Sequence, residues 1–117
     1  MAFEHFDVQQ CDKVTVLRLA APDSFDTDRY AELRRELVEF VEQQRPKKLL
    51  VVFSHVRYCS TAIVNALLLV KERVESDDGL IKLSEMNDTA REVFENLKLA
   101  GTVFDIYTNE AAAMEAF

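Results

Sequence analysis

The chain has 117 residues, 49% of them apolar, so it can bury the core of one ordinary globular domain but hardly of two. Fourteen basic and twenty-one acidic side chains give a net charge of −7, which argues against a nucleic-acid-binding face and against attraction to an anionic membrane. Two cysteines, no signal-peptide pattern and no apolar block long enough to cross a bilayer lead us to expect a cytoplasmic protein without direct membrane insertion.

The first part of the chain predicts a hairpin followed by a helix. Short β-rich runs at residues 6–10 and 14–20 flank a turn at residues 12–13, which indicates two antiparallel strands. Acids and a hydroxyl at residues 26–28 are typical of a helix start. Apolar side chains then recur at helical spacing, namely Tyr30, Leu33, Leu37, Phe40 and Val41.

The second part alternates strands with helices. Residues 49–53 are apolar throughout, as expected for a central strand covered on both faces. The next expected elements are a helix at 61–74, a turn at 77–79 and a strand at 80–84. A helix capped by Asn87 follows; it carries Ala90, Val93, Phe94 and Leu97 and ends near Gly101. The last two expected elements are a strand at 104–107 and a helix at 109–117. This order predicts a single α/β domain over residues 1–117, with a mostly parallel or mixed β-sheet of about five strands and about four helices.

Two hydroxyl residues, Ser60 and Thr61, stand where the strand at 49–53 gives way to the next helix. The backbone N–H groups at a helix N-terminus are unpaired, and the helix dipole favours negative charge there. Ser60 suits the N-cap position, which leaves Thr61 inside the first turn. The pair therefore indicates a helix cap, an anion site or a phosphorylation site.

A helical wheel divides the helix at 61–74 into two faces. The side expected to face the sheet carries Ile63, Ala66, Leu67, Val70 and Val74. The opposite side carries Thr61, Asn65, Leu68 and Glu72, and we expect Leu68 to be exposed there. With Arg57 and Tyr58 in the preceding loop, this side is either a small docking patch or an ordinary solvated face.

Metal binding and catalysis find little support in the sequence. The spacings among His5, Cys11, His55 and Cys59 match no common zinc motif, so neither a metal nor another cofactor is expected. Cys59 is either a reactive thiol at a helix start or, as we expect, a buried inert one. The chain has no P-loop, no glycine-rich dinucleotide motif and no nucleophile elbow, and a small α/β enzyme is kept only as an alternative.

Three consecutive segments carry a family resemblance, namely Leu50-Val51-Val52-Phe53-Ser54, Val56-Arg57-Tyr58-Cys59 and Ser60-Thr61-Ala62-Ile63-Val64-Asn65. The similarity continues through residues 82–83, 87–94, 97–99 and 104–107, and Asp26 stands where the family has an Asp before its first long helix. In this order the segments resemble the STAS domain, the fold of bacterial anti-sigma factor antagonists. The family pattern runs from Leu-Val-Val-Asp-Leu-Ser to Asp-Ser-Ser/Thr-Gly-Leu-Gly.

The resemblance implies a switch based on protein binding. In that family the antagonist captures an anti-sigma factor that is also a serine kinase of the GHKL type, which frees the sigma factor and so controls transcription initiation. Phosphorylation of the first Ser of the Asp-Ser-Ser/Thr motif releases the antagonist, and a PP2C-type phosphatase resets it. The acceptor position corresponds to Thr61, with Ser60 second, and the implied contact surface consists of Asp26, Arg57, Tyr58, Ser60, Thr61, Asn65 and Leu68.

The chain departs from the family pattern around this acceptor. Ser60 stands where the motif has Asp, and Ala62 stands where it has its second hydroxyl residue. Ile63 and Asn65 stand where it has its two glycines. A serine-directed kinase would therefore meet altered surroundings. The alternative within the family is a STAS interaction subunit that is not phosphorylated, such as a scaffold component or a transporter-associated subunit.

Overall fold

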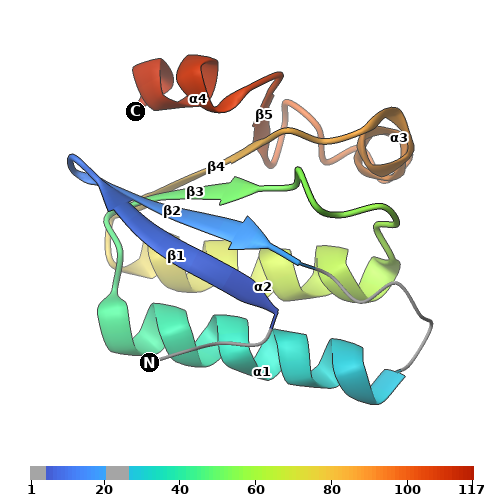
Figure 1. Ribbon diagram of the computed structural model, residues 1–117, viewed down its shortest axis with the longest axis horizontal. Coiled ribbons are helices and arrows are strands. Elements are labelled where there is room, and N and C mark those ends of the chain that lie inside the picture. The colour runs from blue at the N-terminus through green and yellow to red at the C-terminus, as the bar shows by residue number, and fades with distance from the viewer. Residues whose placement is uncertain (1–4, 21–26) are drawn as a thin grey trace.

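Five strands form one mixed sheet in the spatial order β1-β2-β3-β4-β5 (Figure 1). The computed structural model describes residues 5–20 and 27–117. Strand β1 pairs antiparallel with β2, and the other neighbouring pairs are parallel. The elements are β1 (Phe6–Cys11), β2 (Val14–Leu19), α1 (Thr27–Gln44), β3 (Lys48–Val52), α2 (Thr61–Ser76), β4 (Leu80–Ser84), α3 (Asp88–Asn96), β5 (Asp105–Tyr107) and α4 (Glu110–Ala116).

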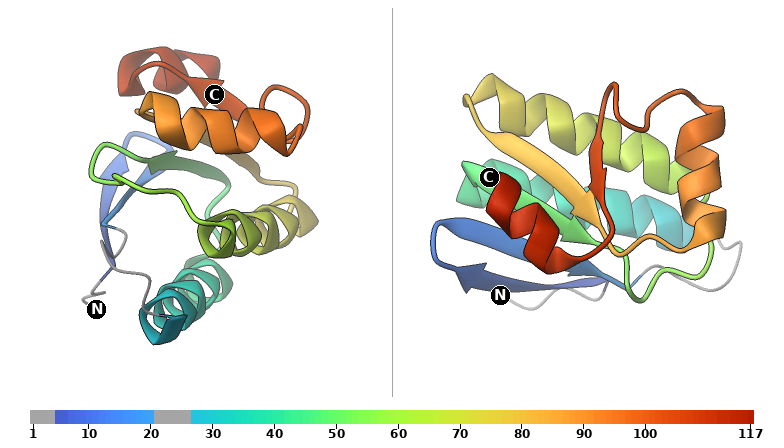
Figure 2. Two further views of the ribbon diagram at one scale, coloured as in Figure 1. Left: turned by 90° about the vertical axis from the view of Figure 1, so that its right-hand side faces the viewer. Right: turned by 90° about the horizontal axis from the view of Figure 1, so that it is seen from above.

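The predicted hairpin and the predicted alternation of strands and helices are both confirmed. In the hairpin, β1 and β2 are joined at Asp12, whose φ of 55° is a left-handed conformation that aspartate tolerates better than most residues. Helices α1 and α2 lie side by side on one face of the sheet, and α4 lies on the other (Figure 2). This is the layered α/β arrangement that the alternating sequence pattern indicates.

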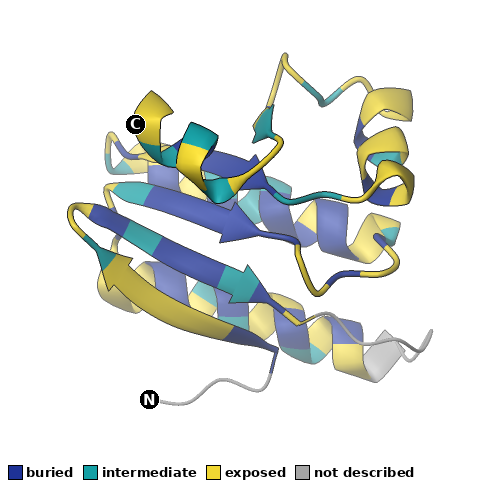
Figure 3. Ribbon diagram, turned by 45° about the horizontal axis from the view of Figure 1, so that its top comes forward, coloured by how far each residue is buried: buried dark blue, intermediate teal, exposed yellow. Residues whose placement is uncertain are grey.

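The larger core lies between the sheet and the helix pair α1 and α2 (Figure 3). Inward side chains of β3, such as Leu49 and Val51, are fully buried against it. All the apolar positions predicted for the two helices are buried there too, namely Tyr30, Leu33, Leu37, Phe40, Val41, Ile63, Ala66, Leu67, Val70 and Val74. Each such side chain contributes roughly 1.5–3 kcal/mol relative to exposure, so this layer supplies most of the hydrophobic stabilisation.

The opposite face of the sheet carries a smaller core under α4, and a buried lysine lies beside it. Lys82 Nζ lies 3.1 Å from Asp105 Oδ2 and 5.4 Å from the centre of the Tyr107 ring. Burial lowers the pKa of Lys82, but its hydrogen bonds and charge interactions with Asp105 and Tyr107 together outweigh burial and leave the pKa raised. The charged form of Lys82 is therefore compatible with its position.

The structure differs from the sequence prediction around the end of α3. The helix ends at Asn96, and Leu97, expected among its apolar positions, is the C-cap residue and is 46% exposed. Leu97 stands at the point where the helix ends, and the chain then turns away through Lys98, whose φ is 59°. Gly101 lies beyond this, in a separate turn before β5 with a φ of 78°.

Among residues 5–20 and 27–117, no helix combines the length and the apolar character needed to cross a membrane.

Replacing Gly79 by Ala should destabilise the domain, because the turn between α2 and β4 leaves no room for a Cβ. An added methyl group would lie 2.9 Å from the carbonyl oxygen of Val74 and 3.0 Å from that of Pro46. We expect Gly79→Ala to lower the free energy of unfolding by about 1–3 kcal/mol in urea denaturation. Gly101→Asn is the control, since the space around Gly101 is open and Asn tolerates its positive φ; an equal loss in both variants would contradict the steric explanation.

Candidate functional site

The loop between β3 and α2 is held to the core at two points and is exposed between them. The backbone N–H of Phe53 donates to Ser84 O at 2.9 Å, and that of Val56 donates to Phe53 O at 3.0 Å. Val56 and Cys59 are buried, whereas Arg57 and Tyr58 are exposed, and Tyr58 is 56% exposed. Two large side chains are therefore presented to solvent by a well-anchored segment.

Asn87 connects this loop to the start of α3. Its Nδ2 donates to Val56 O at 3.3 Å and to Arg57 O at 3.2 Å, while its Oδ1 accepts from the backbone N–H of Ala90 at 2.7 Å. The sequence predicted Asn87 as a helix cap, and the cap is confirmed. Its role in positioning the loop was missed, because the loop lies about thirty residues away in sequence.

Ser60 and Thr61 take different roles at the start of α2. Ser60 is the N-cap, and its Oγ accepts from the backbone N–H of Ile63 at 3.3 Å, as the sequence predicted. Thr61 is the first helical residue and is exposed. The first turn of α2 contains no acidic side chain of its own to interact with the positive end of the helix dipole.

The outer side of α2 extends this surface toward α1. Asn65 is exposed and lines a shallow hollow of about 270 Å³ together with Tyr30, Ala31, Arg34 and Ala62. No sequence pattern indicated the α1 side of this hollow, which includes the exposed Arg34. Asp26, the remaining member of the expected contact surface, lies outside the described residues.

Leu68 does not belong to the exposed surface that was expected. It is half-buried and packs against the larger core, so the prediction of an exposed Leu68 was wrong. A single-helix wheel places Leu68 opposite the sheet-facing stripe but takes no account of the side chains packed around the helix, and Leu68 lies against the larger core. We define the docking surface by the exposed residues Arg57, Tyr58, Thr61 and Asn65, with Ser60 half-buried among them.

An open cleft of about 560 Å³ lies at the carboxyl ends of the parallel strands. Ala20, Phe53 and Glu85, which follow β2, β3 and β4, line it together with Ser54, His55, Val56, Arg57 and Asn87. Ligand sites of α/β sheets commonly occupy this edge. The two described side chains with clearly shifted pKa values, Cys59 and Lys82, are not among the lining residues, so the cleft lends little support to the enzyme alternative.

Cys59 is a buried thiol, as expected. Burial raises its pKa from 9.0 to about 12. His5, Cys11, His55 and Cys59, the four residues considered for zinc, do not form one cluster of ligand atoms. Within the described part of the chain, only His5 of those four belongs to a group of side chains whose donor atoms come close enough to hold a metal.

Comparisons with known proteins point to one family. The model of the STAS domain matches residues 5–113. A comparison with curated protein sequences gives no match.

Several solved structures share the fold at low sequence identity. An anti-sigma factor antagonist candidate from Thermotoga maritima is 17% identical with a TM-score of 0.82, covering 95% of this chain and 92% of its own. The phosphorylated form of SpoIIAA, a Bacillus cell fate determinant, is 19% identical with a TM-score of 0.67, covering 96% and 99%. The murine Slc26a9 anion transporter is 14% identical with a TM-score of 0.66; the match covers 92% of this chain but 18% of the transporter.

Replacing Asn87 by Ala should cost more stability than a helix cap alone. The cap contributes about 1 kcal/mol, and each of the two bonds to the loop adds roughly 0.5–1.5 kcal/mol, so we expect a loss of about 2–4 kcal/mol in urea denaturation. Asn109→Ala is the matched control, because Asn109 caps α4 through an equivalent bond to Ala112 N at 2.8 Å. Equal losses in the two variants would mean that the bonds to the loop contribute nothing.

The two cysteines should react with the thiol reagent DTNB at very different rates. At pH 8 a thiol with the ordinary pKa of 9.0 is about one-tenth ionised, whereas a pKa of about 12 lowers the thiolate fraction of Cys59 roughly a thousandfold further. We expect one rapidly reacting thiol in the folded protein, the half-buried Cys11, and a second only after unfolding in urea. Cys11→Ser should abolish the rapid phase, and a rapid phase of two thiols would contradict this assignment.

Proposed function

This chain belongs to the STAS domain family, and on that basis we propose that it is an anti-sigma factor antagonist whose partner docks around Thr61. The observation that carries the proposal is the exposed hydroxyl of Thr61 at the first residue of α2, beside a loop anchored at Val56 and Cys59. The partner is an anti-sigma factor that is also a serine kinase of the GHKL type. Its capture frees a sigma factor and thereby controls transcription initiation in the bacterial cytoplasm.

The chemistry of the docking surface suits protein binding. Tyrosine and arginine contribute disproportionately to binding energy at interfaces, and Tyr58 and Arg57 stand next to each other on this loop. The burial of Val56 and Cys59 limits the loop's freedom before binding. Little conformational entropy is therefore lost when a partner docks.

Phosphorylation of Thr61 would act as the release step. A phosphate adds about −1.5 to −2 charge, which introduces repulsion and a desolvation cost at an interface. The start of α2 carries no acidic side chain in its first turn, and its backbone N–H groups and dipole tolerate an anion. The modified domain would therefore stay folded while its affinity for the partner falls, and a PP2C-type phosphatase would restore binding.

Ser60 is the less suitable acceptor. Its Oγ already accepts the N-cap hydrogen bond from Ile63 N, and its side chain is half-buried. Phosphorylation there would replace the cap that begins the helix. Thr61 offers its hydroxyl at an exposed position without this structural duty.

A non-phosphorylated STAS interaction subunit, such as a scaffold component or a transporter-associated subunit, is the second candidate. The observation that favours it is the altered motif, in which Ser60 replaces the family Asp and Ile63 and Asn65 replace its glycines. In this version the same docking surface binds its partner permanently, and Thr61 is only part of the contact.

A binding experiment with Thr61 variants tests the proposal. Immobilised wild type and Thr61→Ala should both capture a GHKL-type kinase, whereas Thr61→Asp should bind it at least about tenfold more weakly, because the carboxylate imitates part of the phosphate charge. Thr89→Asp is the matched control, since Thr89 is an exposed threonine in the first turn of α3. Incubation of the captured kinase with ATP should label wild type and Ser60→Ala but not Thr61→Ala.

The outcomes separate the two candidates. Equal capture of the kinase by wild type, Thr61→Ala and Thr61→Asp, together with no labelling, would reject the switch and support the permanent interaction subunit. Absence of any GHKL-type kinase among the captured proteins would reject the antagonist proposal itself.

A further inference from the structure

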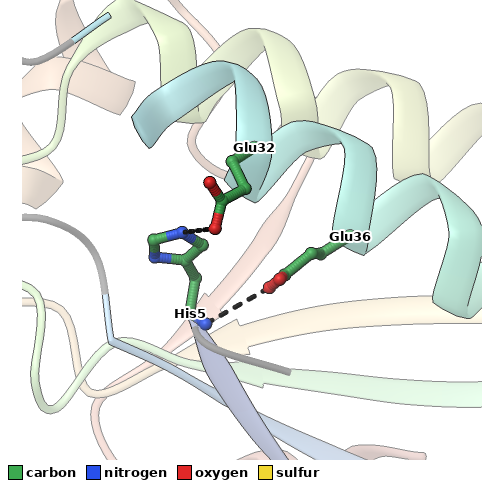
Figure 4. A group of neighbouring side chains, drawn as sticks. All are labelled: His5, Glu32 and Glu36. Carbon is green, nitrogen blue, oxygen red and sulfur yellow. Dashed lines mark hydrogen bonds and ion pairs between the residues drawn. The ribbon is translucent and has the colours of Figure 1, made fainter. Parts of the chain in front are cut away.

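A second group of polar side chains meets where β1 begins beside the middle of α1 (Figure 4). His5 immediately precedes β1, and Glu32 and Glu36 lie one turn apart on α1. His5 Nε2 lies 3.2 Å from Glu32 Oε1, and the backbone N–H of His5 donates to Glu36 Oε1 at 3.2 Å. One imidazole nitrogen and one carboxylate oxygen from each glutamate lie within 4.8 Å of one another, an arrangement found nowhere else in the described part of the chain.

The spacing of these atoms fits the coordination geometry of zinc. Zinc bonds to histidine nitrogen and carboxylate oxygen are about 2.0–2.2 Å long, so neighbouring ligand atoms in a tetrahedral site are roughly 3.3 Å apart. The distance of 3.2 Å between His5 Nε2 and Glu32 Oε1 already has this value. Glu36 is only partly buried, and a change in its side-chain torsions can bring a carboxylate oxygen within the same distance.

The charge and burial of the group also favour a divalent cation. His5 is 5% exposed, so it lies where electrostatic interactions are weakly screened. One imidazole and two carboxylates offer their donor atoms there, a set of ligands that a divalent transition-metal ion binds. The side chain of Glu32 is 35% exposed, which leaves a path for an ion to enter from solvent.

We propose that His5, Glu32 and Glu36 form a zinc-binding site with one further position open to water. One imidazole and two carboxylates suit zinc and similar first-row transition metals better than magnesium or calcium, which prefer oxygen ligands alone. The bound ion ties the start of β1 to α1 and stabilises the folded domain by mass action. The site shares no residue with the docking surface, so its test is independent of the proposed function.

Titration of the metal-free full chain with ZnCl2, followed by calorimetry and by thermal unfolding, tests the site. We expect one zinc ion per chain and an unfolding temperature that rises with zinc concentration, with no such response to MgCl2 or CaCl2. Co²⁺ used as a spectroscopic probe should give the absorption bands of nitrogen and oxygen ligation without a thiolate charge-transfer band. Such a thiolate band would overturn the proposal, because it would assign the metal to Cys11 or Cys59.

Substitutions assign the ligands. His5→Gln should reduce the affinity for zinc at least about tenfold, and His55→Gln, which changes the only other histidine, should leave it unchanged. Because His5 is buried and its loss can impair folding, Glu32→Gln serves as the second variant; it keeps the size of a partly exposed side chain and should also weaken binding about tenfold. Absence of stoichiometric zinc binding by the wild type, or equal affinity in wild type and Glu32→Gln, would overturn the proposal.

Discussion

The geometry of the docking surface depends on the burial of β3 between its two parallel neighbours. Leu49, Leu50, Val51 and Val52 are at most 1% exposed, with alternate side chains in the two cores. A shift of one residue would exchange the two sets of side chains and displace every residue that follows. Pairing with β2 and β4 on either side makes such a shift costly. The carboxyl end of β3, where the loop begins, therefore has a fixed position.

The fold buries some side chains of this short segment and exposes others. Val56 and Cys59 are buried and anchor the loop, whereas Tyr58 and Thr61 are exposed. Asn87 reinforces the division because it binds two loop carbonyl groups while it caps α3. A change at the exposed Thr61 therefore need not disturb the core, and the proposed switch requires this.

Sequence reasoning succeeded where one local pattern decides the outcome. The apolar stripes of α1 and α2, the turn between β1 and β2 and the caps of α2 and α3 follow from residues within a few positions of one another. It failed at Leu68, because a wheel describes one helix and ignores the elements that pack around it. It also failed at Leu97, because the helical period was extended past Asn96, where α3 ends.

The sequence alone thus determined the order of strands and helices, the layers that they form and the hydroxyl pair at the start of α2, since hydrophobic periodicity and capping are local properties. Only the tertiary structure decided which distant groups meet. Asn87 reaches the loop across about thirty residues, Arg34 of α1 lines the hollow beside Asn65, and His5 meets Glu32 across 27 residues. No local sequence pattern predicts these contacts, because they arise from the packing of α1 and α3 against a sheet assembled from separate parts of the chain.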